Sequence, residues 1–303
     1  MTEAIINSVL LMGILILIGY FLKKKDVINE KVEKSLTFIL LYICVPGLII
    51  KAFDINYTPE KLRLGLQIIL ISVVHSVVLI VVNYLLIYKI RDKEKKKILQ
   101  ISNVITNFGF MGYPVVFQIF GEEGLFFASM YSIPIIILMW TYGLSSFFTK
   151  IGKSEIKNIF VNPGMVAFYF GITVFIFSIE IPPLIDSTLG TLGEMTTPLS
   201  MFIIGARLAI VKRKEILSDE MVYYGAFVKL IVAPVLMLII LSFVELPTII
   251  RGVAIVYGSL PPAAMIVILA KQYNGNTEFS SKTVVIQHIL SLATIIFFLT
   301  LFL

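Results

Sequence analysis

The sequence predicts an all-α membrane protein with ten transmembrane helices, arranged as two inverted repeats of five, in which helices four and nine are broken. Composition is the first observation behind this prediction: 58% of the 303 residues are hydrophobic and only 15% are charged, which is typical of a polytopic membrane protein. The second observation is that apolar runs recur at the length of ~20 residues that a membrane-spanning helix needs. The third is a set of prolines at matched positions in the two halves of the chain.

The apolar runs are far too long for the strands of a membrane β-barrel, so each run is expected to be a helix. They leave only short loops between them and no soluble domain. The ten expected spans cover residues 4–22, 36–53, 65–88, 98–119, 125–149, 160–179, 190–211, 220–243, 248–271 and 282–302.

Basic residues test the number of spans, because short cytoplasmic loops carry an excess of lysine and arginine. Every loop after an odd-numbered span is basic, whereas the opposite loops hold only Lys51, Lys61, Arg63 and Arg251. We therefore expect both termini outside, in what we take to be a bacterial cytoplasmic membrane. The net charge of +6 then reflects topology rather than nucleic-acid binding. The basic loops contain Lys23, Lys24, Lys25, Lys31, Lys34, Lys89, Arg91, Lys93, Lys95, Lys96, Lys97, Lys150, Lys153, Lys157, Lys212, Arg213, Lys214, Lys271 and Lys282.

The two expected repeats are residues 1–150 and 151–303. Pro46 in span two matches Pro198 in span seven, and Pro114 in span four matches Pro262 in span nine. Five spans per repeat give the repeats opposite orientations in the membrane, as in many secondary transporters. Chance pairing of the prolines is the alternative.

Two spans are interrupted, and interrupted spans in corresponding positions indicate a transporter binding site. Pro114 and Pro262 are each expected to start a half-helix, Val115–Phe120 and Ala263–Ala270, with free N–H groups and a positive dipole end facing the break. Such ends favour an anion. The alternative is that the prolines only kink helices and the asparagines only join them. The candidate substrate-binding residues are Asn103, Asn107, Tyr113, Pro114, Tyr257, Ser259, Pro261 and Pro262.

Charged or titratable groups within spans are rare, so each one is a candidate for ion coupling or charge balance. Lys229 lies well inside span eight and either balances charge or reaches back to the membrane surface. Glu194, near the start of span seven, is either a coupling site or a solvated end residue. His75 in span three either relays protons or is a hydrogen-bonded core histidine.

Several stretches resemble a known family. Asn107-Phe-Gly-Phe-Met-Gly-Tyr-Pro114, Leu260-Pro-Pro262 and Ala270-Lys-Gln-Tyr-Asn274 are similar to the two crossover motifs of the auxin efflux carrier family, which includes bacterial malate permeases. The resemblance implies a bile-acid-symporter-like fold in which spans four and nine cross. It also implies a transport bundle of spans 3, 4, 5, 8, 9 and 10 that moves like an elevator against a scaffold of spans 1, 2, 6 and 7, and a homodimer. The implied substrates are organic anions, chiefly carboxylates.

The sequence thus predicts a secondary carrier that moves small organic anions, such as malate-like or auxin-like acids, by alternating access. The expected partners are that anion and the lipid bilayer, with no nucleic acid, no metal and no cofactor beyond a coupling Na⁺ or H⁺. An enzyme is not expected, because the chain has two histidines, no metal-ligand spacing and no Gly-x-Ser-x-Gly or phosphate-binding loop. The alternative is an ion exchanger or a symporter of another substrate class on the same fold.

Overall fold

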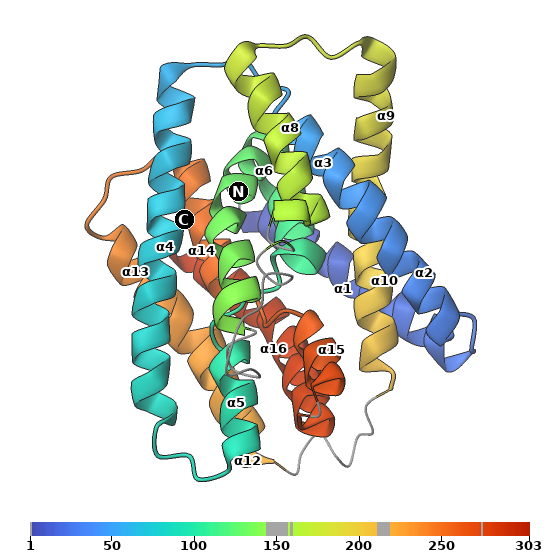
Figure 1. Ribbon diagram of the computed structural model, residues 1–303, viewed down its shortest axis with the longest axis vertical. Helices are drawn as coiled ribbons and strands as arrows, with labels where there is room; N and C mark the ends of the chain where they lie inside the picture. The colour runs from blue at the N-terminus through green and yellow to red at the C-terminus, as the bar shows by residue number, and fades with distance from the viewer. Residues whose placement is uncertain (1, 144–156, 158–159, 211–218, 274) are drawn as a thin grey trace. The chain divides into compact units, whose positions relative to one another are not determined.

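The computed structural model describes residues 2–143, 157, 160–210, 219–273 and 275–303 (Figure 1). Within these residues the secondary structure is helical, apart from one isolated antiparallel bridge. The basic residues Lys150, Lys153, Lys212, Arg213 and Lys214, the boundary expected at residues 150 and 151, and Asn274 lie outside the described residues. Among the described residues, six stretches are long and apolar enough to cross a membrane, namely Ile5–Lys24, Glu30–Ala52, Pro59–Ile87, Phe108–Gly143, Glu220–Leu241 and Thr277–Phe302, and two shorter apolar helices are Pro163–Phe177 and Thr248–Ser259.

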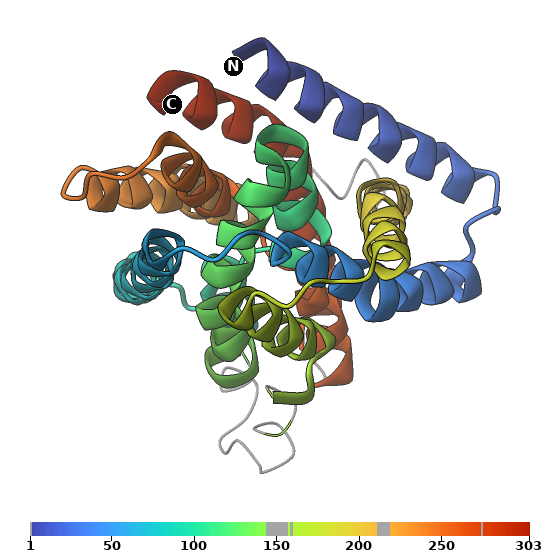
Figure 2. The same cartoon turned by 90° about the horizontal axis from the view of Figure 1, so that it is seen from above.

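The chain forms two compact units, and each unit combines segments from both halves of the sequence. The first unit contains residues 1–69, 109–133 and 157–210. Its first helices are α1 (Thr2–Lys24), α2 (Glu30–Ile39) and α3 (Val45–Ala52), and the π-helical turn Leu40–Cys44 joins α2 to α3 in one rod (Figure 2). It also holds the start of α4 (Pro59–Ile87) and most of α6 (Tyr113–Leu138). Its last helices are α8 (Pro163–Phe177), α9 (Pro183–Glu194) and α10 (Thr196–Leu208).

Glycines allow α1 and α10 of the first unit to pack with their backbones in contact. A Cβ atom on Gly205 would lie 2.0 Å from the backbone oxygen of Ile16, and one on Gly19 would lie 2.4 Å from that of Phe202. Small residues let membrane helices approach this closely, because dispersion contacts rather than the hydrophobic effect hold helices together in lipid. The pair α1 and α10 is therefore a rigid contact that tolerates no added atom.

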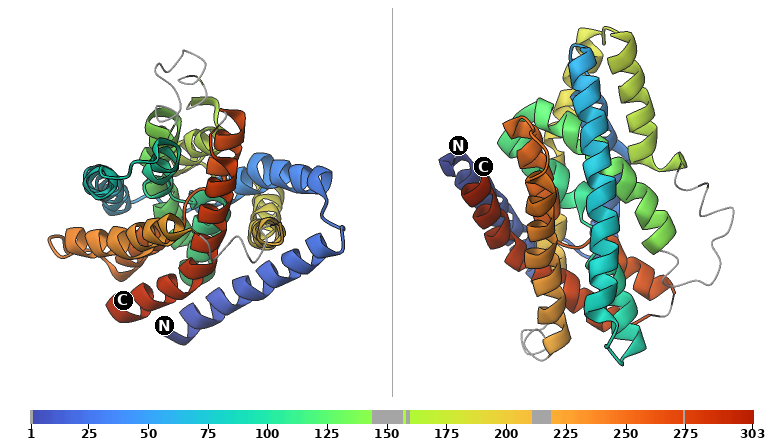
Figure 3. Two further views of the ribbon diagram at one scale, coloured as in Figure 1. Left: turned by 90° about the horizontal axis from the view of Figure 1, so that it is seen from below. Right: turned by 90° about the vertical axis from the view of Figure 1, so that its left-hand side faces the viewer.

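The second unit contains residues 70–108, 134–156 and 211–303. It includes the rest of α4 and α5 (Lys93–Ser102), followed later in the chain by α12 (Glu220–Phe227) and α13 (Ala233–Leu241). Its last helices are α14 (Thr248–Ser259), α15 (Met265–Gln272) and the long α16 (Thr277–Phe302), which packs against α12, α14 and α15 (Figure 3).

Three prolines follow π-helical turns at the same spacing. Pro46, Pro114 and Pro234 each lie two residues after the end of such a turn, which covers Leu40–Cys44, Phe108–Gly112 and Val228–Val232 respectively. Proline has no N–H group and its ring clashes with the carbonyl four residues earlier, so a widened turn accommodates it without ending the helix. These prolines therefore reshape their helices rather than interrupt them.

This finding corrects the expected position of the first break. Helix α5 ends at Ser102 and helical backbone resumes at Phe108, so the break covers residues 103–107 rather than starting a half-helix at Pro114. The half-helix does end as expected after Phe120, because Gly121 has a φ of 63°. The second break covers residues 260–264, and α15 begins within two residues of its expected start. The span expected at residues 190–211 is not one helix, because α9 ends at Glu194 and α10 begins at Thr196, on either side of Met195.

Candidate functional site

The two breaks lie against each other within the second unit. Thr106 and Pro262 form an antiparallel bridge. The amide of Asn107 donates to the carbonyl of Pro261 at 2.8 Å, and the amide of Ala263 donates to the carbonyl of Ile105 at 3.0 Å. Backbone groups inside a membrane need partners from the protein. Each break therefore satisfies part of the other, which explains how two non-helical segments can be buried.

The side chain of Thr106 adds to this pairing. Its hydroxyl lies 3.4 Å from the carbonyl oxygens of both Leu260 and Pro261. Pro261 and Pro262 cannot donate hydrogen bonds, so the pairing cannot extend into a wider sheet. Every residue from 103 to 107 and from 260 to 264 is buried, so the paired breaks form an enclosed polar region.

Asn107 and His288 form the closest side-chain contact at this region. Asn107 Nδ2 lies 2.8 Å from His288 Nε2, and His288 Nδ1 lies 2.7 Å from the carbonyl oxygen of Val284. Asn107 is 2% exposed and His288 is 3% exposed. A carbonyl oxygen only accepts, so Nδ1 of His288 carries a hydrogen and Nε2 accepts from Asn107 in the neutral ring. The donor that was expected to hold the substrate is thus engaged by a histidine.

Asn103 lies at the start of the first break, four residues before Asn107, and contacts a second polar group. Its Nδ2 donates to Asn83 Oδ1 at 2.9 Å, while its Oδ1 is enclosed and has no partner. Both amide atoms of Gln287 on α16 are also enclosed without partners. A Cβ atom on Gly225 would lie 3.2 Å from Gln287 Nε2 and 3.5 Å from Asn103 Oδ1. Asn103 and Gln287 therefore flank the same glycine, and we call them the amide pair.

The unpartnered atoms of the amide pair reduce the stability of the folded protein. An enclosed polar atom without a hydrogen bond costs about 1–3 kcal/mol, and buried polar groups in proteins nearly always have a partner. Three such atoms on two side chains that flank one glycine indicate that water or a bound molecule completes this region. Sequence reasoning identified Asn103 but missed Gln287 and Asn83, because polar residues on an apolar helix do not reveal their partners.

Lys229 is buried, with only 1% of its surface exposed. It lies in the π-helical turn before α13, and none of the ion pairs among the described residues includes it. The side chain therefore does not reach back to the membrane surface. It lies close enough to His75 for their charges to interact, and His75 Nε2 lies 3.0 Å from the carbonyl oxygen of Ala233. His75 is thus a hydrogen-bonded, buried histidine.

The other predicted site residues have varied surroundings. Tyr257 is buried, and the buried hydroxyl of Ser259 donates to the carbonyl of Ile255 within α14 at 2.8 Å. Tyr113 is buried in the first unit, within hydrogen-bonding reach of Ser129 and Ser132. The remaining first-unit residues are Pro114, which is buried, and Glu194, which is exposed at the end of α9.

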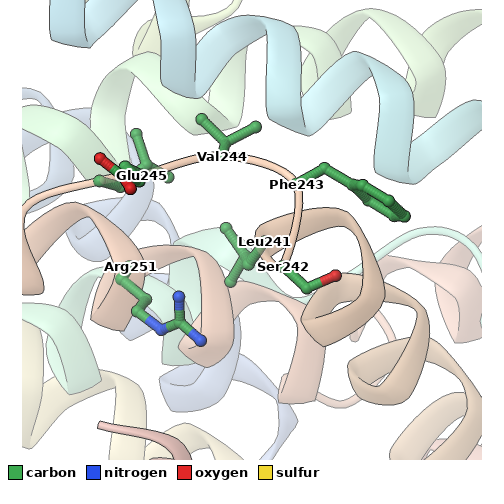
Figure 4. Close-up of a pocket in the computed structure, with 7 residues that line it drawn as sticks. Leu241, Ser242, Phe243, Val244, Glu245 and Arg251 are labelled. Atoms are coloured by element: carbon green, nitrogen blue, oxygen red, sulfur yellow. The ribbon is translucent and has the colours of Figure 1, made fainter.

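A surface pocket of about 610 Å³ lies away from the breaks, at the loop between α13 and α14 (Figure 4). Its residues include Glu245 and Arg251, at the opposite end of α14 from Ser259. Within the described part of the chain, no group of three or more His, Cys, Asp or Glu side chains could hold a metal ion.

Comparisons with known proteins agree with this picture. The profile of the membrane transport protein family matches residues 4–160 and 145–299. An uncharacterized transporter of Methanocaldococcus jannaschii is 26% identical over 95% of this chain and 96% of its own length. Auxin efflux carrier component 1 of Arabidopsis thaliana is 26% identical over 48% of this chain and 24% of its own length. A Rhizobium meliloti protein described as a candidate malonate transporter is 28% identical over 46% of this chain and 43% of its own length.

Long apolar helices, buried breaks and these matches together define a multi-pass membrane transporter rather than an enzyme. The chain belongs to the membrane transport protein family, which includes the auxin efflux carriers.

Proposed function

We propose that this transporter is a secondary carrier of small organic anions, chiefly carboxylates. The observation that carries the proposal is the enclosed polar region where residues 103–107 pair with residues 260–264. It contains amide and hydroxyl groups, with no Asp or Glu in either break. A cation inside a membrane protein is usually balanced by a carboxylate, and neither break offers one, which favours an anion. The names of two relatives refer to auxin and malonate, which are both carboxylates.

Lys229 supplies the charge in this proposal. A buried ammonium group needs a compensating charge, since a charge inside a membrane protein is expensive. The ion pairs of the described residues leave Lys229 without a carboxylate, so a bound anion is a suitable counterion. Glu194 has no such role in the proposal, because it is exposed at a helix end.

Transport is proposed to proceed by alternating access, with an elevator movement of a bundle formed by spans 3, 4, 5, 8, 9 and 10. The division of contacts into two units supports this choice. Helices α1, α2, α3, α8, α9 and α10 belong to the first unit, whereas α5 and α12 to α16 belong to the second. The start of α4 and most of α6 depart from this division, because they belong to the first unit although spans three, four and five are in the proposed bundle. The inverted repeats of residues 1–150 and 151–303, outward-facing termini and a homodimer remain part of the proposal.

Uptake into proteoliposomes tests this function. Labelled malonate, malate and indole-3-acetate are supplied with a pH gradient, a sodium gradient or no gradient, and a labelled cation serves as the control. We expect uptake of at least one carboxylate, and the gradients identify the coupling ion. Uptake of the cation in place of every carboxylate would favour the alternative, an ion exchanger or a symporter of another substrate class.

Asn107 provides the residue-level test. Losing one hydrogen bond to a charged group costs about 1.5–3 kcal/mol, so Asn107→Ala should weaken anion binding about ten- to hundred-fold. Asn107→Asp should weaken it further, because a carboxylate repels the anion. If asparagine only joined helices, both variants would fail to fold instead. Affinities of folded variants within about twofold of wild type would contradict the assignment.

Orientation needs a separate test. After replacement of Cys44, a single cysteine introduced at Glu123 should react with an impermeant reagent added outside. Reaction only after permeabilisation would reverse the proposed topology.

A further inference from the structure

The contact between Asn107 and His288 fixes which atom of each side chain faces the other. His288 Nδ1 donates to the carbonyl oxygen of Val284 at 2.7 Å. Since the neutral ring carries only one hydrogen, the Nε2 that faces Asn107 has none and acts as an acceptor. Asn107 therefore turns Nδ2 toward the ring at 2.8 Å and its Oδ1 away from it. With neutral His288, the end of the carboxamide that faces away from the ring is thus an acceptor, which repels an anion.

Protonation of His288 reverses this arrangement. The ring then carries hydrogens on both nitrogens, and its Nε2–H cannot face the NH₂ group of Asn107. A half-turn of the carboxamide about its last side-chain bond brings Oδ1 to accept from Nε2 and directs Nδ2 the other way. The exchange needs no backbone movement, because the two ends of the amide have nearly the same shape.

We propose that His288 is a proton-coupling residue: its protonation turns the Asn107 carboxamide, so that the site offers a donor and a nearby positive charge to a carboxylate. Binding of one anion then takes up one proton from solution at His288 Nε2, and release of the anion returns it. This inference rests on the proposed function, since it concerns how the same site recognises its anion.

The surroundings of His288 contain few other groups that could take this role. The elements that pack most extensively against α16 are α5, α12, α14, α15 and the π-helical turn before α13. Their fully buried titratable side chains are Lys229 and Tyr257. On α16 itself, Lys282 pairs with Glu278 at 2.5 Å. The other titratable groups on these elements are at least partly exposed, namely Lys93, Glu94, Lys95, Lys96, Lys97, Glu220, Tyr223, Tyr224, Arg251 and Lys271.

Lys229 strengthens the linkage. It is a buried cation of the same unit, and a positive charge there opposes a second one on His288 while the site is empty. A bound anion offsets both charges. Anion and proton should therefore bind cooperatively, and each must raise the affinity for the other by the same factor.

Nuclear magnetic resonance of the full-length protein labelled with ¹⁵N-histidine tests the proposal directly. The chain has only two histidines, and the signal lost in His75→Gln identifies the other as His288. At alkaline pH without anion, we expect His288 to carry its hydrogen on Nδ1. Saturating malonate, or the carboxylate of the uptake panel that binds best, should raise the pH at which His288 becomes protonated.

Binding measurements provide the second readout. As the pH rises between the midpoints of the free and the anion-bound protein, affinity should fall about tenfold per pH unit, the slope for one linked proton. In His288→Gln this slope should disappear. In Asn107→Asp, His288 should be protonated at higher pH even without anion, because a fixed carboxylate replaces the bound one.

The outcomes separate the two proposals. If an anion binds while the midpoint of His288 stays unchanged, or if His288 carries its hydrogen on Nε2 at alkaline pH, the coupling mechanism is wrong and the carrier function stands. If no carboxylate binds at any pH, the proposed function and this inference both fail.

Discussion

The two units of the protein differ in how their charged and amide side chains are partnered. In the first unit, Lys51 pairs with Asp186, and Arg207 pairs with Glu33 at 2.9 Å while its guanidinium lies over the ring of Phe110. In the second unit, Lys229 is buried and belongs to none of the ion pairs among the described residues, and the amide pair has enclosed atoms without partners. Paired charges are typical of a structural region, whereas a buried charge and buried amides without partners are typical of a site that receives a ligand. The comparison supports the proposal that the second unit holds the substrate site.

The largest expected effect tests the rigidity of the first unit. Gly205→Ala places a Cβ atom 2.0 Å from the backbone oxygen of Ile16, and overpacking of this kind costs about 3 kcal/mol or more. We expect little folded protein by fluorescence-detected size exclusion. Gly13→Ala on α1 is the matched control, because no atom lies within 4 Å of its added Cβ. Equal yields of the two variants would show that α1 and α10 can separate.

The next effect tests the buried charge of the second unit. Lys229→Ala and Lys229→Gln should abolish carboxylate uptake while folded protein remains in the membrane, because the anion loses its counterion. Lys97→Gln is the control, since Lys97 is a partly exposed lysine of the same unit, paired with Glu94 at 2.9 Å. Normal uptake by Lys229→Gln would remove Lys229 from the mechanism.

A smaller effect is expected at the amide pair, where a substitution should increase the stability of the ligand-free protein. Gln287→Met keeps the volume of the side chain and removes two enclosed, unsatisfied atoms, so the ligand-free protein should gain about 1 kcal/mol in stability. Transport should fall in the same variant. Asn83→Leu is the contrasting change, since it leaves Asn103 Nδ2 without its partner and should destabilise the protein. A loss of stability in Gln287→Met, measured by thermal unfolding, would mean that the amide is already satisfied.

The smallest effect concerns a surface pair of the first unit. The hydrogen bond from Lys51 lowers the pKa of Asp186. A carboxyl group whose pKa is lowered by folding stabilises the protein above its unfolded pKa of ~4, and this stabilisation is lost as the pH falls. Asp186→Asn should therefore reduce thermal stability slightly at neutral pH and not under acid conditions. Burial raises the pKa of the neighbouring Asp54, so Asp54→Asn should not reproduce that pattern.

Part of this architecture could be predicted from local sequence features. Apolar length predicted an all-helical membrane protein, although not each of the ten spans, and the polar residues, glycines and prolines of two spans predicted that their helices are broken. The position of the first break could not be predicted, because a proline such as Pro114 is compatible with both an interruption and a widened turn. The partners of Asn107 and Asn103 were also beyond prediction. Asn107 and His288 are 181 residues apart, and only the packing of α16 brings them together.

The pairing of the two breaks has a consequence for how this family can diversify. The bonds between Asn107 and Pro261 and between Ala263 and Ile105 join backbone atoms, so they do not depend on which side chains the two segments carry. Mutations can therefore replace the polar side chains of the two segments and still leave the connection between the segments intact. If the breaks hold the substrate as proposed, single substitutions can change the cargo without first losing the structure that keeps two non-helical segments buried.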